Sequence, residues 1–381
     1  MGDMRKLITA ITGPFELRQC PWVLFCAALL LVGVGGLFVW SAHSAGLAVR
    51  HLMFGGAGVC IFFLVALIDY RHLAGLAIWL YTMGIASLLL LPVFGVTINQ
   101  ARRWYSLGPI NVQPSEPMKY ITVLTVATYF TYRERLDRLR DLVLPLVLTL
   151  IPMFLIVQQP DLGTSLLFLP AFLGIAYVGR VPVRNLLVLV LLGIAVCGAA
   201  WYTPGVIKDY QRERVLTFVQ PDAESHSAAS YNARQATLAI AGGGFEGQGW
   251  GTGLLNQLRR IPERHTDFIF PVIAEEWGFV RTASIILFYL MMIYLIVREI
   301  WRTPDRFGRL VICGVLMVFG FQSLLHMGIS LRLAPITGLT LPLISYGGSS
   351  LVSTFAGFGL VASVAMRRRV IFPDRRMMIS R

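Results

Sequence analysis

Long apolar segments recur along this chain and alternate with shorter polar ones. Each apolar segment approaches the length of a helix that crosses a bilayer, which takes roughly 20 mostly apolar residues. The pattern predicts ten spanning helices, centred on 21–40, 52–68, 73–94, 117–131, 142–157, 162–178, 185–202, 270–297, 307–329 and 345–366. A spanning β-barrel would instead show alternating segments of about ten residues. The predicted fold class is therefore an all-α integral membrane protein, with residues 1–381 forming a single polytopic domain.

Two of these segments are weaker than the others. The segment 117–131 is short, and 162–178 begins directly after the charged Asp161. The composition nevertheless favours a membrane protein, because 56% of the residues are hydrophobic and only 14% are charged. A soluble domain carries roughly 25% charged residues.

The positions of the basic residues predict how the chain is threaded. The short loops 132–141, 179–184 and 298–309 and the tail 367–381 are rich in arginine, which places them in the cytoplasm. Both termini are then cytoplasmic. The outer loops are 95–116, 158–161, 203–269 (the large loop between spans seven and eight) and 330–344. The basic runs are short, scattered and tied to span ends, so nucleic-acid binding is not expected.

The densest polar cluster of the chain, residues 261–270, lies where the large outer loop enters a span. It contains Glu263, Arg264, His265, Thr266 and Asp267, followed at once by apolar residues. Ionisable groups at the edge of the hydrocarbon layer are costly, so they indicate a functional site. A metal site through His265 and Asp267 is poorly supported by two ligands alone. A general base is the better use of Asp267, because an apolar setting raises the pKa of a carboxyl group.

Other outer segments carry candidate binding residues. Arg102, Arg103 and Trp104 suit an anionic headgroup at the interface, although an ordinary aromatic-belt loop would look similar. Glu116 and Lys119 are three residues apart on the first turn of a span and should be paired. Asp161 is either a simple helix cap, or it has a functional role or pairs with Lys119.

The large outer loop is expected to form amphipathic segments on the outer leaflet, including a charged helix face at 209–214. Its glycine-rich run contains a formal GxGxxG pattern at Gly242, Gly244 and Gly247. No strand precedes it, so we interpret these glycines as permitting tight turns or close approach of the backbone to a ligand. The segment 335–350 is rich in proline, glycine and hydroxyl residues. It predicts a re-entrant or broken helix, or hydroxyl contacts between helices.

Taken together, these segments resemble the shape, elongation, division and sporulation (SEDS) family of membrane proteins. The resemblance covers nearly the whole chain, and the matching segments are 102–119, 159–164, 210–214, 262–278 and 345–350. The form of residues 262–265 is closer to the elongation members, RodA, than to the division members, FtsW. The chain departs from the family pattern at Asn111, at His326, where the family usually has asparagine, and at 331–334.

The resemblance implies a peptidoglycan glycosyltransferase that polymerises lipid II at the outer face of the bacterial cytoplasmic membrane. The essential aspartate of the family matches Asp267, and its other sensitive positions match Trp104, Glu116, Lys119, Asp161 and Arg214. The resemblance also implies a divalent cation that accompanies the diphosphate, a class B penicillin-binding protein as partner, and a place in the elongation machinery. No organic cofactor is expected.

The resulting hypothesis assigns a role to each candidate residue. Asp267 takes the proton from the 4-hydroxyl of the acceptor sugar, which attacks the α-linked donor and gives a β-1,4 bond. The departing diphosphate is held by Arg102, Arg103, Lys119 and Arg214. Trp104, His265, Thr266 and Ser345 are further substrate-binding candidates, and Glu116, Lys119 and Asp161 are expected to form a buried charge network.

Three alternatives remain open from the sequence. A flippase for lipid II would also place polar groups within a bundle of spans, although no inverted repeat is evident and the motifs lie on one face. A division-type polymerase would share the same chemistry. A scaffold that only recruits a transpeptidase would not need Asp267.

Overall fold

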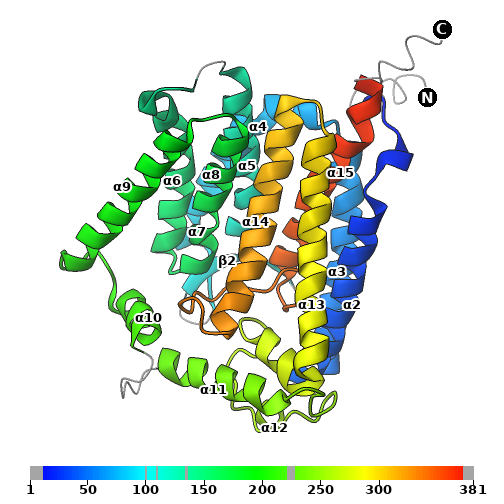
Figure 1. The fold of residues 1–381 in the computed structure, drawn as a ribbon, viewed down its shortest axis with the longest axis vertical. Coiled ribbons are helices and arrows are strands. Elements are labelled where there is room, and N and C mark those ends of the chain that lie inside the picture. The colour runs from blue at the N-terminus through cyan, green and yellow to red at the C-terminus, as the bar shows by residue number, and fades with distance from the viewer. Residues whose placement is uncertain (1–11, 99–100, 109, 134–135, 221–227, 372–381) are drawn as a thin grey trace.

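The protein folds as a bundle of long helices with a layer of short helices across one end (Figure 1). The computed structural model describes residues 12–98, 101–108, 110–133, 136–220 and 228–371. The long helices are α2 (Trp22–Ala42), α3 (Ala45–Leu67), α4 (Tyr70–Phe94), α5 (Ser115–Tyr132), α6 (Val143–Gln158), α9 (Val183–Tyr202), α13 (Ile269–Arg302), α14 (Arg306–Ser330) and α15 (Gly348–Ile371). Two further helices, α7 (Leu162–Leu166) and α8 (Phe168–Val178), follow each other directly, and short 3-10 turns occupy η1 (Leu17–Gln19) and η2 (Leu139–Leu142).

Eight helices in the described part of the chain are long and apolar enough to cross a membrane. The all-α, multi-pass prediction is therefore confirmed at this level. Helix α5 is not among the eight, and residues 162–178 form only a shorter apolar helix. Most of α5 is buried against α4, α6, α8, α14 and α15, so it meets protein rather than lipid. A helix in such a position need not be strongly apolar, which is why hydropathy understates it.

The connecting segments separate into two ends of the bundle. At one end, the Asn185 side chain donates to the carbonyl of Asp137, and Arg306 donates to the carbonyl of Gly179, so the three basic loops lie together. At the other end, the segments before α5, before α7, before α13 and before α15 contact one another. This segregation agrees with the predicted threading, although the residues 372–381 of the basic tail lie outside the described chain.

A small antiparallel sheet occupies the segment between α4 and α5, where the sequence indicated only a loop. Its strands are β1 (Val96–Ile98), β2 (Ala101–Leu107) and β3 (Ile110–Val112), in the order β1-β2-β3. Trp104 pairs with Val96, and Tyr105 pairs with Val112. Neighbouring side chains of a strand point to opposite faces, so this sheet separates residues that are adjacent in sequence.

The large outer loop forms three helices across the end of the bundle, visible at the bottom of Figure 1. These are α10 (Asp209–Val219), α11 (Ala228–Gly243) and α12 (Leu254–Gln257). Helices α10 and α11 are consistent with the predicted amphipathic segments of this loop, and α10 contains the charged helix face predicted at 209–214. Residues 221–227, within the same loop, lie outside the described chain.

The glycine-rich run after α11 inserts into a break in α13. The backbone of Gly278 has φ +73° and ψ −177°, a conformation essentially restricted to glycine. The N–H groups of Gln248 and Gly249 donate to the carbonyls of Glu275 and Glu276 at 3.0 Å each, and Phe279 N–H donates to Gly244. The close approach expected of these glycines is therefore to the protein's own helix α13.

Replacement of Gly278 by alanine is expected to destabilise the folded protein by about 3 kcal/mol or more, because alanine cannot adopt this backbone conformation without strain. An added β-carbon would also lie 2.6 Å from the carbonyl carbon of Glu246. Thermal unfolding of the purified protein in detergent measures the effect. Gly33→Ala is the matched control, since nothing lies within 4 Å of a β-carbon at that position; equal unfolding temperatures for both variants would contradict the prediction.

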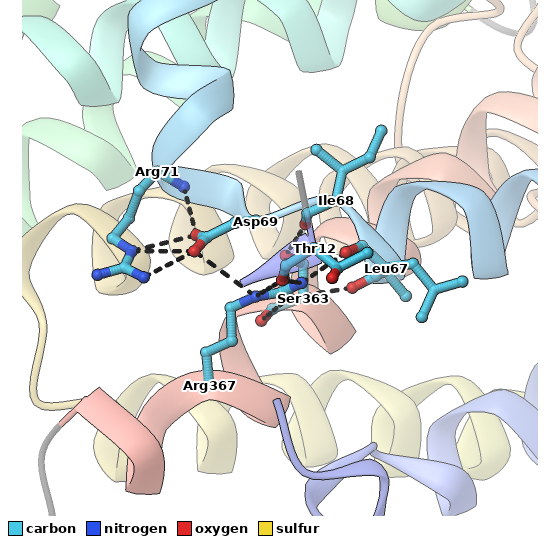
Figure 2. Close-up of polar contacts among 8 residues, drawn as sticks. Thr12, Leu67, Ile68, Asp69, Arg71, Ser363 and Arg367 are labelled. Carbon is cyan, nitrogen blue, oxygen red and sulfur yellow. Dashed lines mark hydrogen bonds and ion pairs between the residues drawn. The ribbon is translucent and has the colours of Figure 1, made fainter. Parts of the chain in front are cut away.

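At the opposite end, a fully buried arginine ties three segments together (Figure 2). Arg367 on α15 donates to the carbonyls of Ala66 and Leu67 at the end of α3, at 3.0 and 2.6 Å, and to the carbonyl of Thr12 at 2.7 Å. Its guanidinium lies 3.8 Å from Asp69, which also pairs with Arg71 at 2.7 Å. Helix-terminal carbonyls lack partners within the helix, so the arginine satisfies them where water is excluded.

Candidate active site

Asp267 lies in the turn that leads into α13, at the end of the bundle covered by α10–α12. The N–H groups of Thr266 and Phe268 both donate to the carbonyl of Glu263, at 3.1 and 3.2 Å, and Glu263 has a positive φ of 43°. Phe268 and Ile269 are buried and anchor the turn in the core. The turn therefore holds the half-buried Asp267 carboxyl in place where the core begins.

Residues 331–347, which we call the final outer loop, lie over this turn. A β-carbon added at Gly338 would lie 3.3 Å from Asp267 Oδ2 and 4.0 Å from Arg214 Nη1. The Ser345 hydroxyl donates to the carbonyl of Thr266 at 2.6 Å, and Tyr346 N–H donates to the carbonyl of His265 at 2.9 Å. The final outer loop thus brings Gly338 to both Asp267 and Arg214, although these residues are far apart in sequence.

The electrostatic setting of Asp267 suits proton transfer near neutral pH. Burial is the main cause that raises the pKa of the Asp267 carboxyl to about 7, and the negative charge of Glu263 contributes to this rise. The positive charges of Arg214 and Arg103 oppose this shift. Burial in turn lowers the pKa of the Arg214 guanidinium, while the nearby Asp267 raises it. The negative charge of Asp161 raises the pKa of both groups, so the charges of these side chains are coupled.

Arg102 and Arg103 were predicted to act together, but their side chains lie on opposite faces of β2 and have different partners. Arg103 donates to the carbonyl of Gln159 at 2.9 Å and to that of Pro160, beside Asp161, and lies 6.0 Å from the Trp104 ring. Arg102 is exposed and donates to the carbonyl of Pro92 and to Thr97. Arg103 therefore belongs to the Asp267 cluster, and the grouping of Arg102 with it is corrected by the alternation of the strand.

Glu116 and Lys119 form a buried ion pair of 2.8 Å inside the bundle. The Lys119 ammonium also donates to Gln322 on α14 at 3.1 Å, and Ser353 on α15 donates to Glu116 at 3.0 Å. Both side chains are almost completely buried and fully engaged. Lys119 therefore fits the predicted charge network and is not placed to hold a departing diphosphate.

Asp161 is not joined to that network in the described part of the chain. Its carboxyl accepts from the Gln113 side chain at 2.8 Å and from Thr164 N–H at 3.1 Å, which caps α7. The predicted partnership of Asp161 with Lys119 is therefore corrected. Asp161 instead lies with Arg103, because the turn before α7 folds against β2.

The other residues predicted to contact substrate make contacts within the protein. The ring of His265 lies 5.0 Å from that of His43 and 6.0 Å from that of Tyr346. The Thr266 hydroxyl donates to Glu263, and Ser345 is buried with both hydrogen-bonding roles used inside the protein. These residues shape the turn that carries Asp267, and the substrate contacts predicted for them remain predictions.

Two acids inside α13 form hydrogen bonds to neighbouring helices. Glu275 accepts from the N–H groups of Leu255 and Asn256, at 2.7 and 3.2 Å. Glu276 accepts from the Asn256 side chain at 2.8 Å and from Ser41. Neither carboxyl pairs with an arginine among the described residues. They fix α12 and α2 to α13 at the outer end.

Sequence reasoning missed three residues that build this site: Gly338, Gln113 and Gln322. Gly338 stands beside Asp267 with a positive φ of 77°. The two glutamines hydrogen-bond Asp161 and Lys119. Gln322 is a polar residue in the middle of an otherwise apolar span, which is a signal that sequence alone offers.

The described residues do not fit a metal ion held by the protein alone. No group of three or more histidine, cysteine, aspartate or glutamate side chains converges among them. Structural sites for zinc and calcium usually need at least four ligands, most of them from the protein. No chemical step is therefore assigned to a protein-bound metal ion.

This arrangement defines a class: a multi-pass membrane protein with a half-buried carboxyl of raised pKa at one end of the helix bundle. The chain matches the family described as "Cell cycle protein" (FtsW, RodA and SpoVE) over residues 21–370. It therefore belongs to that family, the SEDS family that the sequence motifs indicated.

The relatives include peptidoglycan glycosyltransferases named MrdB, RodA and FtsW. The peptidoglycan glycosyltransferase MrdB of Escherichia coli K12 is 34% identical, with 92% of this chain and 94% of MrdB covered. A probable peptidoglycan glycosyltransferase FtsW of Nitrosococcus halophilus is 32% identical, with 90% and 91% covered. Family membership is thus shown, while the two subgroups are not separated by identity alone.

Solved structures support the same fold. A chain of a peptidoglycan synthase complex that coordinates polymerization and crosslinking is 35% identical, with a TM-score of 0.79, covering 93% of this chain and 98% of that one. The rod shape determining protein RodA of Thermus thermophilus is 32% identical, with a TM-score of 0.69, covering 91% and 97%.

The separation of Arg102 from Arg103 gives a direct test of the site. Arg103→Ala is expected to slow glycan polymerisation by about 10²-fold, the usual effect of removing one group that stabilises developing charge. Arg102→Ala, on the same strand but directed away, is expected to stay within about threefold of the unaltered protein. Initial rates with labelled lipid II measure both. Equal losses of polymerisation rate in the two variants would contradict the different roles assigned to Arg102 and Arg103.

Proposed function

We propose that this membrane protein, a peptidoglycan glycosyltransferase like its relatives, polymerises lipid II into β-1,4-linked glycan strands with Asp267 as general base. The observation that carries the proposal is the half-buried Asp267 carboxyl, which has a pKa of about 7 and lies in the field of the positive charges of Arg214 and Arg103. A base with this pKa is half deprotonated at neutral pH and still accepts a proton readily.

The reaction is a single displacement. The Asp267 carboxylate removes the proton of the acceptor 4-hydroxyl as that oxygen bonds to the anomeric carbon of the donor. The bond from this carbon to the diphosphate oxygen breaks, and the diphosphate leaves with the electron pair. An α-linked donor therefore gives a β-linked product. One carboxyl suffices because the diphosphate leaves without being protonated, whereas a glycosidase needs an acid as well.

The cationic side chains of the cluster match the charge that develops on the leaving group. Arg214 is partly desolvated and lies near Asp267, and the positive charge of Arg103 also acts on this carboxyl. Fixed cations in a place poor in water stabilise a developing negative charge more strongly than in bulk solvent. We assign diphosphate binding to Arg103 and Arg214, with Trp104 as an adjoining contact, and no longer to Arg102 or Lys119.

The proposed topology has ten spans, the eight apolar helices together with α5 and the pair α7–α8. Both termini then lie in the cytoplasm of a bacterium, and Asp267 lies at the outer face of the cytoplasmic membrane. The arginine-rich loops at the end opposite Asp267 support this orientation. Modification of a single cysteine introduced at exposed Glu263 by a reagent that does not cross membranes tests it.

A role in cell elongation is supported by the RodA-like form of residues 262–265 and by the likeness to a rod shape determining protein. By analogy with the synthase complex, we propose a class B penicillin-binding protein as partner, within the elongation machinery. A divalent cation that enters with the diphosphate is also proposed. Its test is whether lipid II binding, measured without turnover, weakens after chelation.

The rate of polymerisation is expected to rise as pH increases through about 7, because only the deprotonated Asp267 can accept the proton. The raised pKa places the midpoint near neutrality, well above the usual value for aspartate of about 3.9. Initial rates at saturating lipid II between pH 5 and 9 measure this. A profile that is flat from pH 5 to 8 would exclude a titrating base with this pKa.

The decisive experiment for function uses the purified protein in detergent and in vesicles, supplied with labelled lipid II. Polymer formed by the unaltered protein, and lost in Asp267→Asn, supports catalysis. Movement of lipid II across vesicles without any polymer would favour a flippase. Normal cell shape in a strain that carries only Asp267→Asn would favour a scaffold.

A further inference from the structure

Side chains from the spanning helices hold the backbone of the final outer loop at three points. His326 Nδ1 lies 2.7 Å from the carbonyl of Leu339, and Gln322 Nε2 donates to the carbonyl of Thr340 at 3.0 Å. The Tyr289 hydroxyl donates to the carbonyl of Pro342. Irregular backbone within a membrane protein needs such partners, because no water satisfies it there.

Two of these three contacts come from one face of α14. Gln322 and His326 are four residues apart, one helical turn, so their side chains lie above one another. Both are almost completely buried, with 2% and 1% of their surface exposed. They hold the carbonyls of consecutive residues, Leu339 and Thr340, directly after Gly338. Side chains of α14 therefore hold the segment 338–340, which lies next to Asp267.

Gln322 also contacts the buried ion pair. Its Oε1 accepts from the Lys119 ammonium at 3.1 Å, which leaves its amide N–H group directed at Thr340. Lys119 is in turn paired with Glu116 at 2.8 Å. A continuous path thus runs from the ion pair through Gln322 and the final outer loop to Gly338, beside the Asp267 carboxyl.

We propose that Gln322 is a positioning residue for Asp267, which holds the final outer loop over the carboxyl and links it to the Glu116–Lys119 pair. His326 is the second support of the same loop. This inference rests on the proposed function of Asp267 and deepens it, because it gives the buried ion pair a part in the reaction without any contact with substrate.

The physical effect of Gln322 is on the surroundings of Asp267. When the loop lies close, Gly338 excludes water from one side of the carboxyl, and desolvation keeps the carboxyl basic. When the loop loosens, water enters, the pKa of Asp267 falls, and the geometry of proton transfer is lost. A displacement of about 1 Å at a reacting group can cost about 10²-fold in rate.

The test compares Gln322→Met with Ser323→Ala in the full-length protein in detergent. Methionine has a similar length but cannot donate to Thr340. Ser323 is equally buried on α14, yet its hydroxyl donates only to Phe319 within the helix. Gln322→Met is expected to lower the polymerisation rate about 10- to 100-fold. It is also expected to move the midpoint of the pH profile down by about half a unit or more, whereas Ser323→Ala changes neither.

Two outcomes would overturn the inference. One is a Gln322→Met rate within about twofold of that of Ser323→Ala, and the other is a reduced rate with an unchanged midpoint, since a merely structural role would not move the midpoint. Failure of the proposed function is distinct, because Asp267→Asn would then retain activity whatever Gln322→Met does.

A second pair of variants applies if Gln322→Met does not fold. His326→Phe removes the contact with Leu339, and His326→Gln retains a donor at this position. We expect His326→Gln to be faster by about fivefold or more, which corresponds to the usual contribution of one hydrogen bond. Equal rates for the two variants would overturn the support assigned to α14.

Discussion

Asp267→Asn is expected to reduce the rate of glycan polymerisation by about 10² to 10⁴-fold, the usual contribution of a general base. Asparagine keeps the shape of the side chain beside Gly338, but its amide cannot accept the proton of the acceptor hydroxyl. The loss should appear in the turnover rate at saturating lipid II, measured by the appearance of polymer on gels. It should also remove the rise in rate through pH 7.

The same variant should fold at least as well as the unaltered protein. The pKa of Asp267 is raised in the folded state, so the unfolded state loses this proton first as pH increases. Ionisation of Asp267 therefore lowers the free energy of unfolding progressively between the unfolded value, about 3.9, and about 7. Asparagine has no such penalty, and at pH 8 its unfolding temperature should equal or exceed that of the unaltered protein. Residual activity above about one tenth would contradict the role of Asp267 as base.

Lys119→Met is expected to destabilise the protein by about 3 to 5 kcal/mol, because it leaves the Glu116 carboxylate buried without its ion-pair partner. Ser353 alone then satisfies that carboxylate, and Gln322 loses its contact with the ammonium group. Thermal and denaturant unfolding in detergent measure the loss. Polymerisation should fall as well, since the final outer loop loses the support that passes through Gln322.

The double variant Glu116→Gln with Lys119→Met separates the two effects. Removal of both charges leaves no buried charge unpaired, so most of the stability should return. The amide of Gln322 remains without its lysine, and the rate should stay low. A Lys119→Met protein as stable as the unaltered one would contradict a buried ion pair, and full activity in the double variant would contradict its link to Asp267.

Much of the fold was predictable because a bilayer imposes a simple condition on sequence. Segments in contact with lipid must be apolar over about 20 residues, and eight helices among the described residues meet this condition. Helix α5 meets it less well, since protein surrounds Glu116 and Lys119. The β1–β3 sheet was not predicted, because its strands are three to seven residues long and their pattern is no clearer than that of a loop.

The candidate base was also visible in the sequence, since Asp267 stands at the entrance of an apolar span where an ionisable group is costly. Its companions were only partly predictable. Arg102 and Arg103 are equivalent in sequence and differ only because neighbouring residues of a strand face opposite ways. Gly338 gave no signal in the sequence. Gln322 stood out as a polar residue within a span, but the sequence did not show its partners, because they lie on segments far away along the chain.

The sequence by itself determined that this is a multi-pass membrane protein of its family, which end of the bundle carries the densest polar cluster, and which carboxyl is the best candidate base. These properties follow from local composition, since solvation by lipid or water acts on each segment separately. Only the tertiary structure decided that Arg103 and not Arg102 joins Asp267, that Asp161 stands apart from Lys119, and that Gln322 connects the ion pair to the final outer loop. Such contacts depend on how distant segments pack, and the composition of a single segment does not predict its packing partners.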